Sequence, residues 1–100
     1  MSKPLTFDQA KEMHLKTLEQ YVPVVSRVHG DNHPEFHEVR QLFDAINEKI
    51  KEAGSNKPAL SEEFAKLRDI TRDYTVPRDV CESYEAVYVM LAEIDKAYND

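Results

Sequence analysis

The sequence predicts an all-α fold, an up-down-up-down four-helix bundle that forms a single domain over residues 1–100. Along most of the chain, apolar residues recur at alternating steps of three and four, the spacing of one face of an amphipathic helix. No segment shows the apolar-polar alternation of a strand, and the chain has only two glycines. The helical patterns are separated by short breaks, which is typical of helices that pack as an up-and-down bundle.

The first helix is expected to begin at Thr6 or Asp8, either of which can cap it, and to end near Gly30. Pro23 lies inside this segment, and an interior proline removes a backbone hydrogen bond and bends a helix. Because the apolar phase continues across Pro23, we expect one helix kinked there rather than two separate helices. The predicted core positions are Ala10, His14, Thr17, Tyr21, Val24 and Val28.

The second helix has the clearest pattern of the chain. Pro34 favours a helix start because its missing N–H would have no partner in the first turn, and Gly54 marks the end. The predicted core positions between them are Phe36, Val39, Phe43, Ile46, Ile50 and Ala53.

Two further helices are expected after the loop that follows Gly54. Ser61 opens the third, and Pro77 separates it from the fourth, because the residue before a proline is disfavoured in a helix. The third helix should bury Leu60, Phe64, Leu67, Thr71 and Tyr74, and the fourth should bury Val80, Tyr84, Val87, Leu91, Ile94 and Tyr98.

Charge and composition exclude several classes of function. The formal net charge of −6 and the lack of a basic patch argue against nucleic acid and anionic membrane as partners. No serine has the surroundings of a catalytic triad, and no glycine-rich loop could cradle a phosphate. The sequence does not decide whether the chain is an enzyme, but it favours a role that is not enzymatic. A single cysteine and the absence of a secretory pattern at the N-terminus predict a cytoplasmic protein.

The main candidates for chemistry are three histidines within nine residues, His29, His33 and His37. Imidazole is the commonest metal ligand among side chains, so these three are the predicted metal contacts. Other interpretations stay open: His37 lies outside the apolar stripe and could be a solvated surface residue, and His33 could cap the turn. Cys81 precedes the fourth helix and is either a redox-sensitive thiolate or a buried cysteine.

A second candidate feature is an interaction surface. Tyr88 and Met90 fall outside the predicted apolar stripe of the fourth helix, so we expect them to form an exposed patch. A small bundle with such a patch would form a homodimer or dock on a protein partner.

Two blocks of sequence carry a family resemblance. The first is Val28-His29-Gly30 followed by His33-Pro34-Glu35-Phe36, and the second is Leu67-Arg68-Asp69-Ile70-Thr71-Arg72-Asp73-Tyr74 with Pro77, Asp79, Cys81 and Tyr84. In this order they resemble the hemerythrin-like proteins that repair iron–sulfur centres after oxidative or nitrosative stress. The resemblance extends from about Tyr21 to Asp95 and implies a bacterial, cytosolic, stress-linked four-helix bundle.

The resemblance also implies a non-haem di-iron site bridged by carboxylates. The family's Val-His-Gly histidine matches His29, whereas its other histidines find no match and fall near Asp8, Ala53 and Lys57. We therefore expect iron as the cofactor if there is one, without an intact di-iron centre in a single chain.

Three hypotheses follow for the function. The first is a stress-linked metal-binding protein of the iron–sulfur repair lineage that uses His29, His33 and His37. The second is a metal-free helical interaction module. The third is a metal site that two chains build by pooling the same histidines across a symmetric interface.

Overall fold

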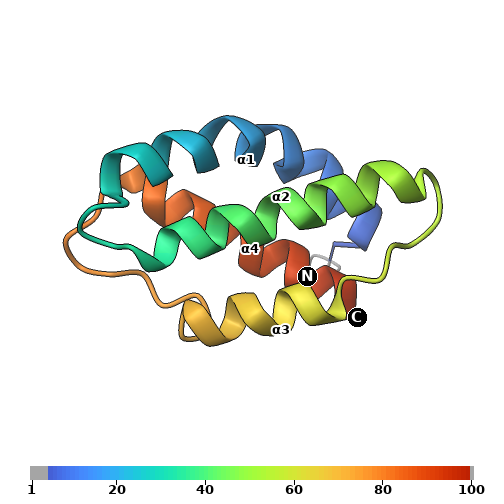
Figure 1. The fold of residues 1–100 in the computed structure, drawn as a ribbon. Helices are drawn as coiled ribbons and strands as arrows, with labels where there is room; N and C mark the ends of the chain where they lie inside the picture. The colour runs from blue at the N-terminus through green and yellow to red at the C-terminus, as the bar shows by residue number, and fades with distance from the viewer. Residues whose placement is uncertain (1–4, 100) are drawn as a thin grey trace, which may run out of the picture.

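The computed structural model describes residues 5–99, which fold into four α-helices without any strand. Helix α1 spans Phe7–His29, α2 Glu35–Ala53, α3 Ser61–Ile70 and α4 Glu82–Asn99 (Figure 1). Helix α1 packs against α4 and α2, and α2 packs against α3. The radius of gyration is 13.0 Å, as expected for a compact chain of about 100 residues. The predicted all-α fold is confirmed.

Helix α1 begins with a capping box at Thr6. The Thr6 hydroxyl accepts a hydrogen bond from the Gln9 N–H at 3.2 Å, and the Gln9 side chain accepts one from the Thr6 N–H at 3.0 Å. Of the two predicted caps, Thr6 is therefore the one used. Pro23 lies inside the helix, which runs as one element from Phe7 to His29.

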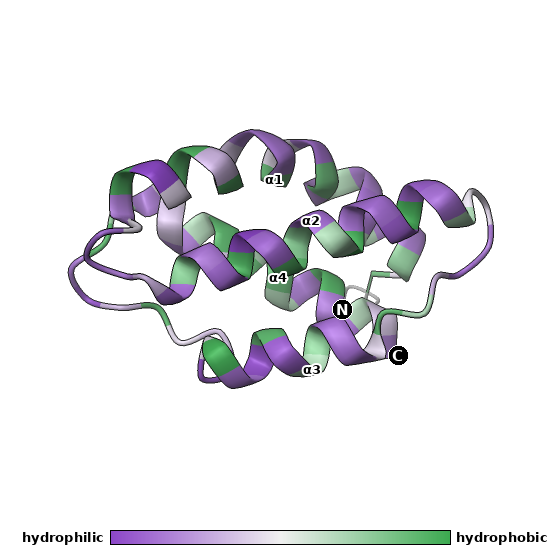
Figure 2. Ribbon diagram, in the orientation of Figure 1, coloured by the Kyte–Doolittle hydropathy of each residue, from purple (hydrophilic) through white to green (hydrophobic). Residues whose placement is uncertain are grey.

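The predicted buried face of α1 is wrong from its middle onward. Tyr21, Val24 and Val28 are 37%, 43% and 59% exposed. The buried residues of this helix are Phe7, Ala10, Leu18, Val22, Val25 and Ser26. In this half of the helix the buried Leu18, Val22 and Val25 are spaced by four and three, as Tyr21, Val24 and Val28 are by three and four. Figure 2 shows hydrophobic residues interleaved with hydrophilic ones along α1. Spacing alone could not decide which set faces α4.

Helix α2 follows the prediction closely. Its buried residues are Phe36, Val39, Phe43, Ile46 and Ile50, and Gly54 ends it with a φ of 60°. This left-handed conformation is the one that glycine adopts without steric cost.

Helix α3 is shorter than its apolar pattern predicts, because it ends at Ile70 and not near Tyr74. Arg72, Asp73 and Tyr74 have φ values of 53°, 57° and 61°, so the chain makes a left-handed turn directly after the helix. Each such residue is strained by about 1–2 kcal/mol when it is not glycine. Tertiary contacts must therefore hold this turn in place.

Helix α4 is buried around more of its circumference than its apolar stripe predicts. Tyr88 and Met90 are only 2% and 8% exposed, so the predicted exposed patch at these two residues is wrong. The physical reason is that α4 is covered by more than one neighbour. In Figure 1 it lies behind α2 and between α1 and α3. The exposed large hydrophobic side chain on this helix is Val89, at 49%.

Candidate functional site

The candidate site lies where the end of α1 meets the start of α4, at the left of Figure 1. His29 is the last residue of α1, His33 lies in the connection to α2, and Asp79 and Cys81 come directly before α4. Together with Tyr84 we call these residues the histidine end. The topology brings together two segments that are about 50 residues apart in the chain, as shown by the separation of 52 between His29 and Cys81.

The closest pair of potential metal ligands or reactive groups is His29 with Cys81. The Nε2 atom of His29 lies 3.1 Å from the Sγ atom of Cys81. Cys81 is exposed, and its carbonyl oxygen accepts the N–H of Glu85 at 3.2 Å, which places it at the N-terminus of α4. Imidazole and thiol are thus in contact at a surface that solvent and small ligands can reach.

His33 is held by two carboxylates. Its Nε2 atom lies 3.1 and 3.2 Å from the two oxygens of Asp79, and its Nδ1 atom lies 3.3 Å from Glu35 Oε2. The His33 side chain is 14% exposed, whereas that of Asp79 is 68% exposed. This arrangement fixes the orientation of the ring and ties the segment before α4 to the start of α2.

Two tyrosines form the floor beneath the histidines. The Tyr84 ring lies edge-on to both His29 and His33, with centroid distances of 5.5 Å. Its hydroxyl lies 3.0 Å from that of Tyr88. Burial, followed by the hydrogen bond to Tyr88, raises the pKa of Tyr84 far above its usual range, and burial also raises the pKa of Tyr88. The floor therefore stays uncharged.

His37 does not join the other two histidines. Its Nδ1 atom lies 3.1 Å from the Ser26 hydroxyl, and its ring lies directly over Gly30. A Cβ atom at Gly30 would come within 2.6 Å of His37 Nε2, so glycine is needed here for the close approach. The structure therefore places His29 and His33 against Tyr84, and it places His37 against Ser26 of α1.

His14, predicted on the core face, is only partly buried. Its side chain is 12% exposed, and its Nε2 atom lies 3.4 Å from Glu93 Oε1 on α4. This distance is long for a hydrogen bond, and the atom has no hydrogen-bond partner among residues 5–99.

Within residues 5–99, no group of three or more His, Cys, Asp and Glu side chains is placed so that it could hold a metal ion. The three predicted metal contacts instead have different partners: His29 contacts Cys81, His33 contacts Asp79 and Glu35, and His37 contacts Ser26. Two pairs of potential ligands lie at the histidine end, His29 with Cys81 and His33 with Asp79.

An open pocket of about 490 Å³ lies beside the histidine end. It lies between His33 and the left-handed turn after α3. The residues that line it are His33, Glu35, Ile70, Thr71, Arg72, Thr75, Pro77 and Tyr88. Solvent therefore reaches the site from this side as well.

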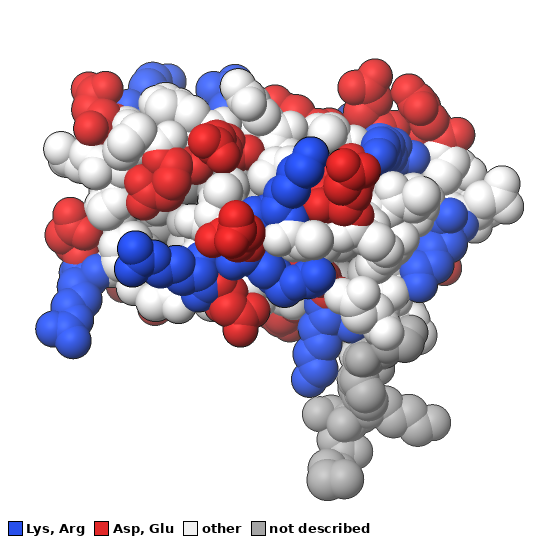
Figure 3. All heavy atoms as spheres, turned by 60° about the horizontal axis from the view of Figure 1, so that its bottom comes forward, with Lys and Arg blue, Asp and Glu red and all other residues white. Residues whose placement is uncertain are grey.

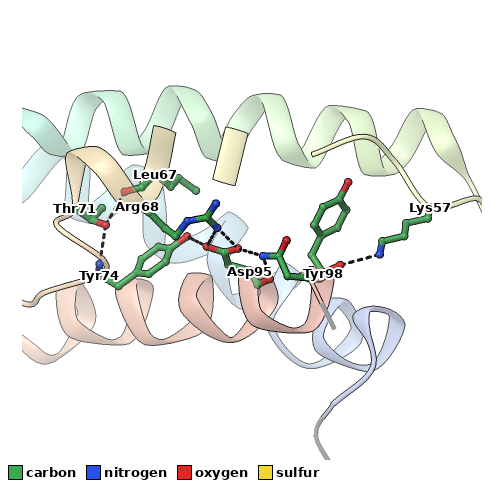
Figure 4. A network of polar contacts seen from close by, with 8 residues as sticks. Lys57, Leu67, Arg68, Thr71, Tyr74, Asp95 and Tyr98 are labelled. Carbon is green, nitrogen blue, oxygen red and sulfur yellow. Dashed lines mark hydrogen bonds and ion pairs between the residues drawn. The ribbon is translucent and has the colours of Figure 1, made fainter. Parts of the chain in front are cut away.

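A second polar cluster, which the sequence analysis missed, surrounds Asp95 on α4 (Figure 4). Arg68 Nη1 donates to both Asp95 oxygens at 2.6 and 2.8 Å, and the Tyr74 hydroxyl donates at 2.7 Å. The Asn99 amide donates to Asp95 Oδ1 at 2.7 Å. We call Arg68, Tyr74, Asp95 and Asn99 the Asp95 cluster. The only sequence signal for it was that Asp95 and Asn99 are one helical turn apart.

The Asp95 cluster holds the strained turn after α3. Tyr74 is the last left-handed residue, and its hydroxyl bonds to Asp95 while its N–H donates to Thr71 Oγ1 at 2.8 Å. The Asp95 carboxylate raises the pKa of Arg68. Burial, together with the bond to Asp95, raises the pKa of Tyr74 far above its usual range.

On the face shown in Figure 3, Lys and Arg side chains are interspersed with Asp and Glu side chains, so this face has no patch of a single charge. Among the described residues, no helix is long and apolar enough to cross a membrane. No family model matches the chain, and no solved structure matches it. The resemblance to the hemerythrin-like iron–sulfur repair proteins stays a prediction.

Proposed function

We propose that this chain binds a divalent iron or zinc ion reversibly through His29 and Cys81, and that it acts in the iron–sulfur repair lineage that its sequence resembles. The single observation that supports this proposal is the contact of 3.1 Å between His29 Nε2 and Cys81 Sγ. A neutral imidazole and a thiolate are ligands that both metals accept.

The spacing of the two atoms fits a shared metal ion. With Zn–S and Zn–N bonds of about 2.3 and 2.05 Å and a tetrahedral angle, the nitrogen and sulfur atoms would lie roughly 3.6 Å apart. The observed 3.1 Å must therefore open by only about half an ångström. Cys81 is exposed, so a small rotation of its side chain suffices.

Two protein ligands make a weak site with open positions. Structural metal sites in proteins are closed by four protein ligands, whereas sites that react or exchange keep positions open. A site of this kind suits a protein that passes a metal ion on, for example during the rebuilding of a damaged cluster. If two chains each contribute His29 and Cys81, the four ligands would complete the coordination sphere.

The proposal is tested by anaerobic titration of ferrous ion into the tag-free protein, by calorimetry with light scattering on the same samples. Zinc is titrated separately. We expect saturable binding, with one metal per chain or one per dimer. Cys81→Ser and His29→Gln should each weaken it by more than about tenfold, since even partners of metal ligands change affinity by 10 to 100-fold.

His37→Gln is the matched control, because it removes an imidazole from the same segment of the chain without touching the His29–Cys81 pair. Its affinity should equal that of the wild type. Absence of binding in the wild type would refute the proposal, as would an equal loss in all three variants.

The cellular role has its own test. In a strain that lacks the gene, iron–sulfur enzymes should recover more slowly after peroxide, and the wild-type gene should restore the rate while the Cys81→Ser gene should not. Normal recovery in the deletion strain would contradict a repair role even if the metal binds.

The proposal retains two finer features of the fold, the up-down-up-down order of the helices and a kink at Pro23. Pro23 has no N–H to donate to the carbonyl of Glu19, which supports a local bend in α1. Residual dipolar couplings of α1 would measure the angle between its two halves. A straight helix would contradict the kink.

A metal-free interaction module remains the second candidate function. Tyr88 and Met90 are buried and cannot serve as its surface. The candidate is favoured instead by the exposed apolar side chains of α1.

A further inference from the structure

We infer that the exposed apolar face of α1, extended by Val89 of α4, binds a second copy of this chain. We define this surface, the α1 face, as Met13, Tyr21, Val24, Val28 and Val89. The inference deepens the second candidate function and does not depend on metal binding.

The α1 face is continuous. At 3.6 residues per turn, the four α1 residues fall within an arc of roughly 80°. Three of them, Tyr21, Val24 and Val28, were predicted to face the core. The four are 57%, 37%, 43% and 59% exposed in the order Met13, Tyr21, Val24, Val28. Helix α1 therefore has a second apolar face, which residues 5–99 leave roughly half exposed.

Val89 extends this face onto α4. His14 lies near Glu93 and His29 lies near Cys81, so α1 and α4 run in opposite directions side by side. Val89 lies between these two points on α4 and thus next to the middle of α1. It is 49% exposed, and it brings the exposed large hydrophobic side chains of the described residues to a total of five, all on the α1 face.

The charges beside the α1 face complement those of a second copy of the same chain. On the α2 side, the exposed Glu12 lies near the start of α1 and the exposed Arg27 near its end. On the α4 side, the exposed Glu85 lies near the start of α4 and the exposed Lys96 near its end. None of these four side chains forms an ion pair within the described part of the chain.

An antiparallel second copy satisfies both sets of charges at once. A twofold axis perpendicular to α1 would place Arg27 of each chain near Glu12 of the other, and Glu85 near Lys96. A twofold axis parallel to α1 would instead turn the α2 side of one chain toward the α4 side of the other. Because α1 and α4 run in opposite directions, it would place Glu12 near Lys96 and Arg27 near Glu85. Both twofold arrangements therefore pair opposite charges. An anionic membrane is disfavoured because the net charge is −6 and Glu82, Glu85 and Glu93 lie on the α4 side of the face.

The size of the α1 face indicates the affinity expected for the dimer. The stretch from Met13 to Val28 is about 22 Å long at 1.5 Å per residue, so the contact lies toward the small end of specific interfaces. We expect a weak dimer in exchange with the monomer.

Sedimentation equilibrium from about 10 µM to about 1 mM, the range in which small interfaces associate, tests the inference. EDTA is present throughout, so that metal-linked association cannot contribute. The wild-type mass should rise from 11.6 kDa toward twice that value. Val24→Glu should stay monomeric, and Ala65→Glu, which adds the same charge at an exposed residue of α3, should behave as the wild type.

Charge reversal distinguishes the antiparallel from the parallel arrangement. Arg27→Glu and Glu12→Arg should each weaken the dimer. The double variant should restore an antiparallel dimer and leave a parallel dimer weak, because the reversed charges would then face Glu85 and Lys96. A wild type that stays monomeric up to the highest concentration overturns the inference, and so does a Val24→Glu variant that still dimerises. Failure of these experiments would leave the iron and zinc titrations of the histidine end unaffected.

Discussion

The Asp95 cluster and the histidine end use the same kinds of polar side chain in opposite ways. Asp95 is 3% exposed, and its carboxylate accepts hydrogen bonds from Arg68, Tyr74 and Asn99. Cys81 is exposed, and its sulfur has a contact with one side chain, that of His29. Both clusters join segments that are far apart in the sequence.

The difference separates a structural role from a functional one. A buried carboxylate with its acceptor positions filled has no lone pair left for a ligand, and removing it would leave its partners unsatisfied. An exposed thiol beside an imidazole can exchange its partner at little cost to the fold. The following predictions sharpen this contrast, beginning with the largest expected effect.

Asp95→Ala should be the most destabilising change. It leaves Arg68 and Tyr74 without their acceptor and releases the turn after α3, so we expect a loss of roughly 3 kcal/mol in the free energy of unfolding. This value already allows for the 39% exposure of the Arg68 side chain, which weakens the ion pair. Urea unfolding measures it, with the exposed neighbour Asp69→Ala as control. A loss below about 1 kcal/mol would mean that the cluster does not hold the fold.

Gly30→Ala should follow, with a loss of roughly 1–3 kcal/mol from overpacking. Its Cβ would meet both the His37 ring and the Ser26 carbonyl oxygen. In a His37→Ala background the loss should shrink without vanishing, because the backbone contact with Ser26 remains. Thermal unfolding of the four proteins in this cycle measures the coupling. Additive effects would contradict the close packing of His37 on Gly30.

Tyr74→Phe should cost about 1–2 kcal/mol at neutral pH, since it removes one donor from a charged acceptor. The substitution should also change how the free energy of unfolding depends on pH. The pKa of Tyr74 is raised in the folded protein by burial and by Asp95, so the folded state keeps a proton that the unfolded chain loses above about pH 10.

Stability supplied by this group is complete below that pH and falls as the pH rises further, by about 1.4 kcal/mol per pH unit for each such tyrosine. Tyr74→Phe should lose stability less steeply than the wild type between pH 9 and 11, as measured by urea unfolding across that range. Equal slopes in the variant and the wild type would mean that the pKa of Tyr74 is not raised in the folded protein.

Cys81→Ser should have the smallest effect on stability, within about 0.5 kcal/mol, as is usual for exposed positions. The same variant should lose metal binding. Urea unfolding in the presence of EDTA measures the first property without interference from the second. A large loss of stability would assign His29 and Cys81 to the structure of the bundle.

Much of the fold could be predicted because local spacing determines it. Helix α2 has one apolar stripe between Pro34 and Gly54, and that stripe is the buried face. Helix α1 has two such stripes, and only the packing of α4 decides between them. The turn after α3 could not be predicted, because its three successive left-handed residues are strained and one of the hydrogen bonds that hold them joins Tyr74 to the distant Asp95.

The site shows the same limit. His29 was predicted as a metal contact from its place in the sequence, but its neighbour Cys81 lies 52 residues away and only the tertiary fold brings them together. His37 was grouped with His29 by proximity in the chain, whereas the helical start at Glu35 turns it toward Ser26. Distance along the sequence is a poor measure of which ligands converge.

The central claim is that a metal ion enters at His29 and Cys81 and leaves the other polar groups undisturbed. Zinc titration followed by NMR, with the ring Cε1–H signals of the four histidines and the Cβ signal of Cys81 in view, tests it most directly. We expect the His29 and Cys81 signals to shift together while those of His14 and His37 stay in place. Shifts that begin at His37 or His14, or no shift at any of these signals, would contradict the claim.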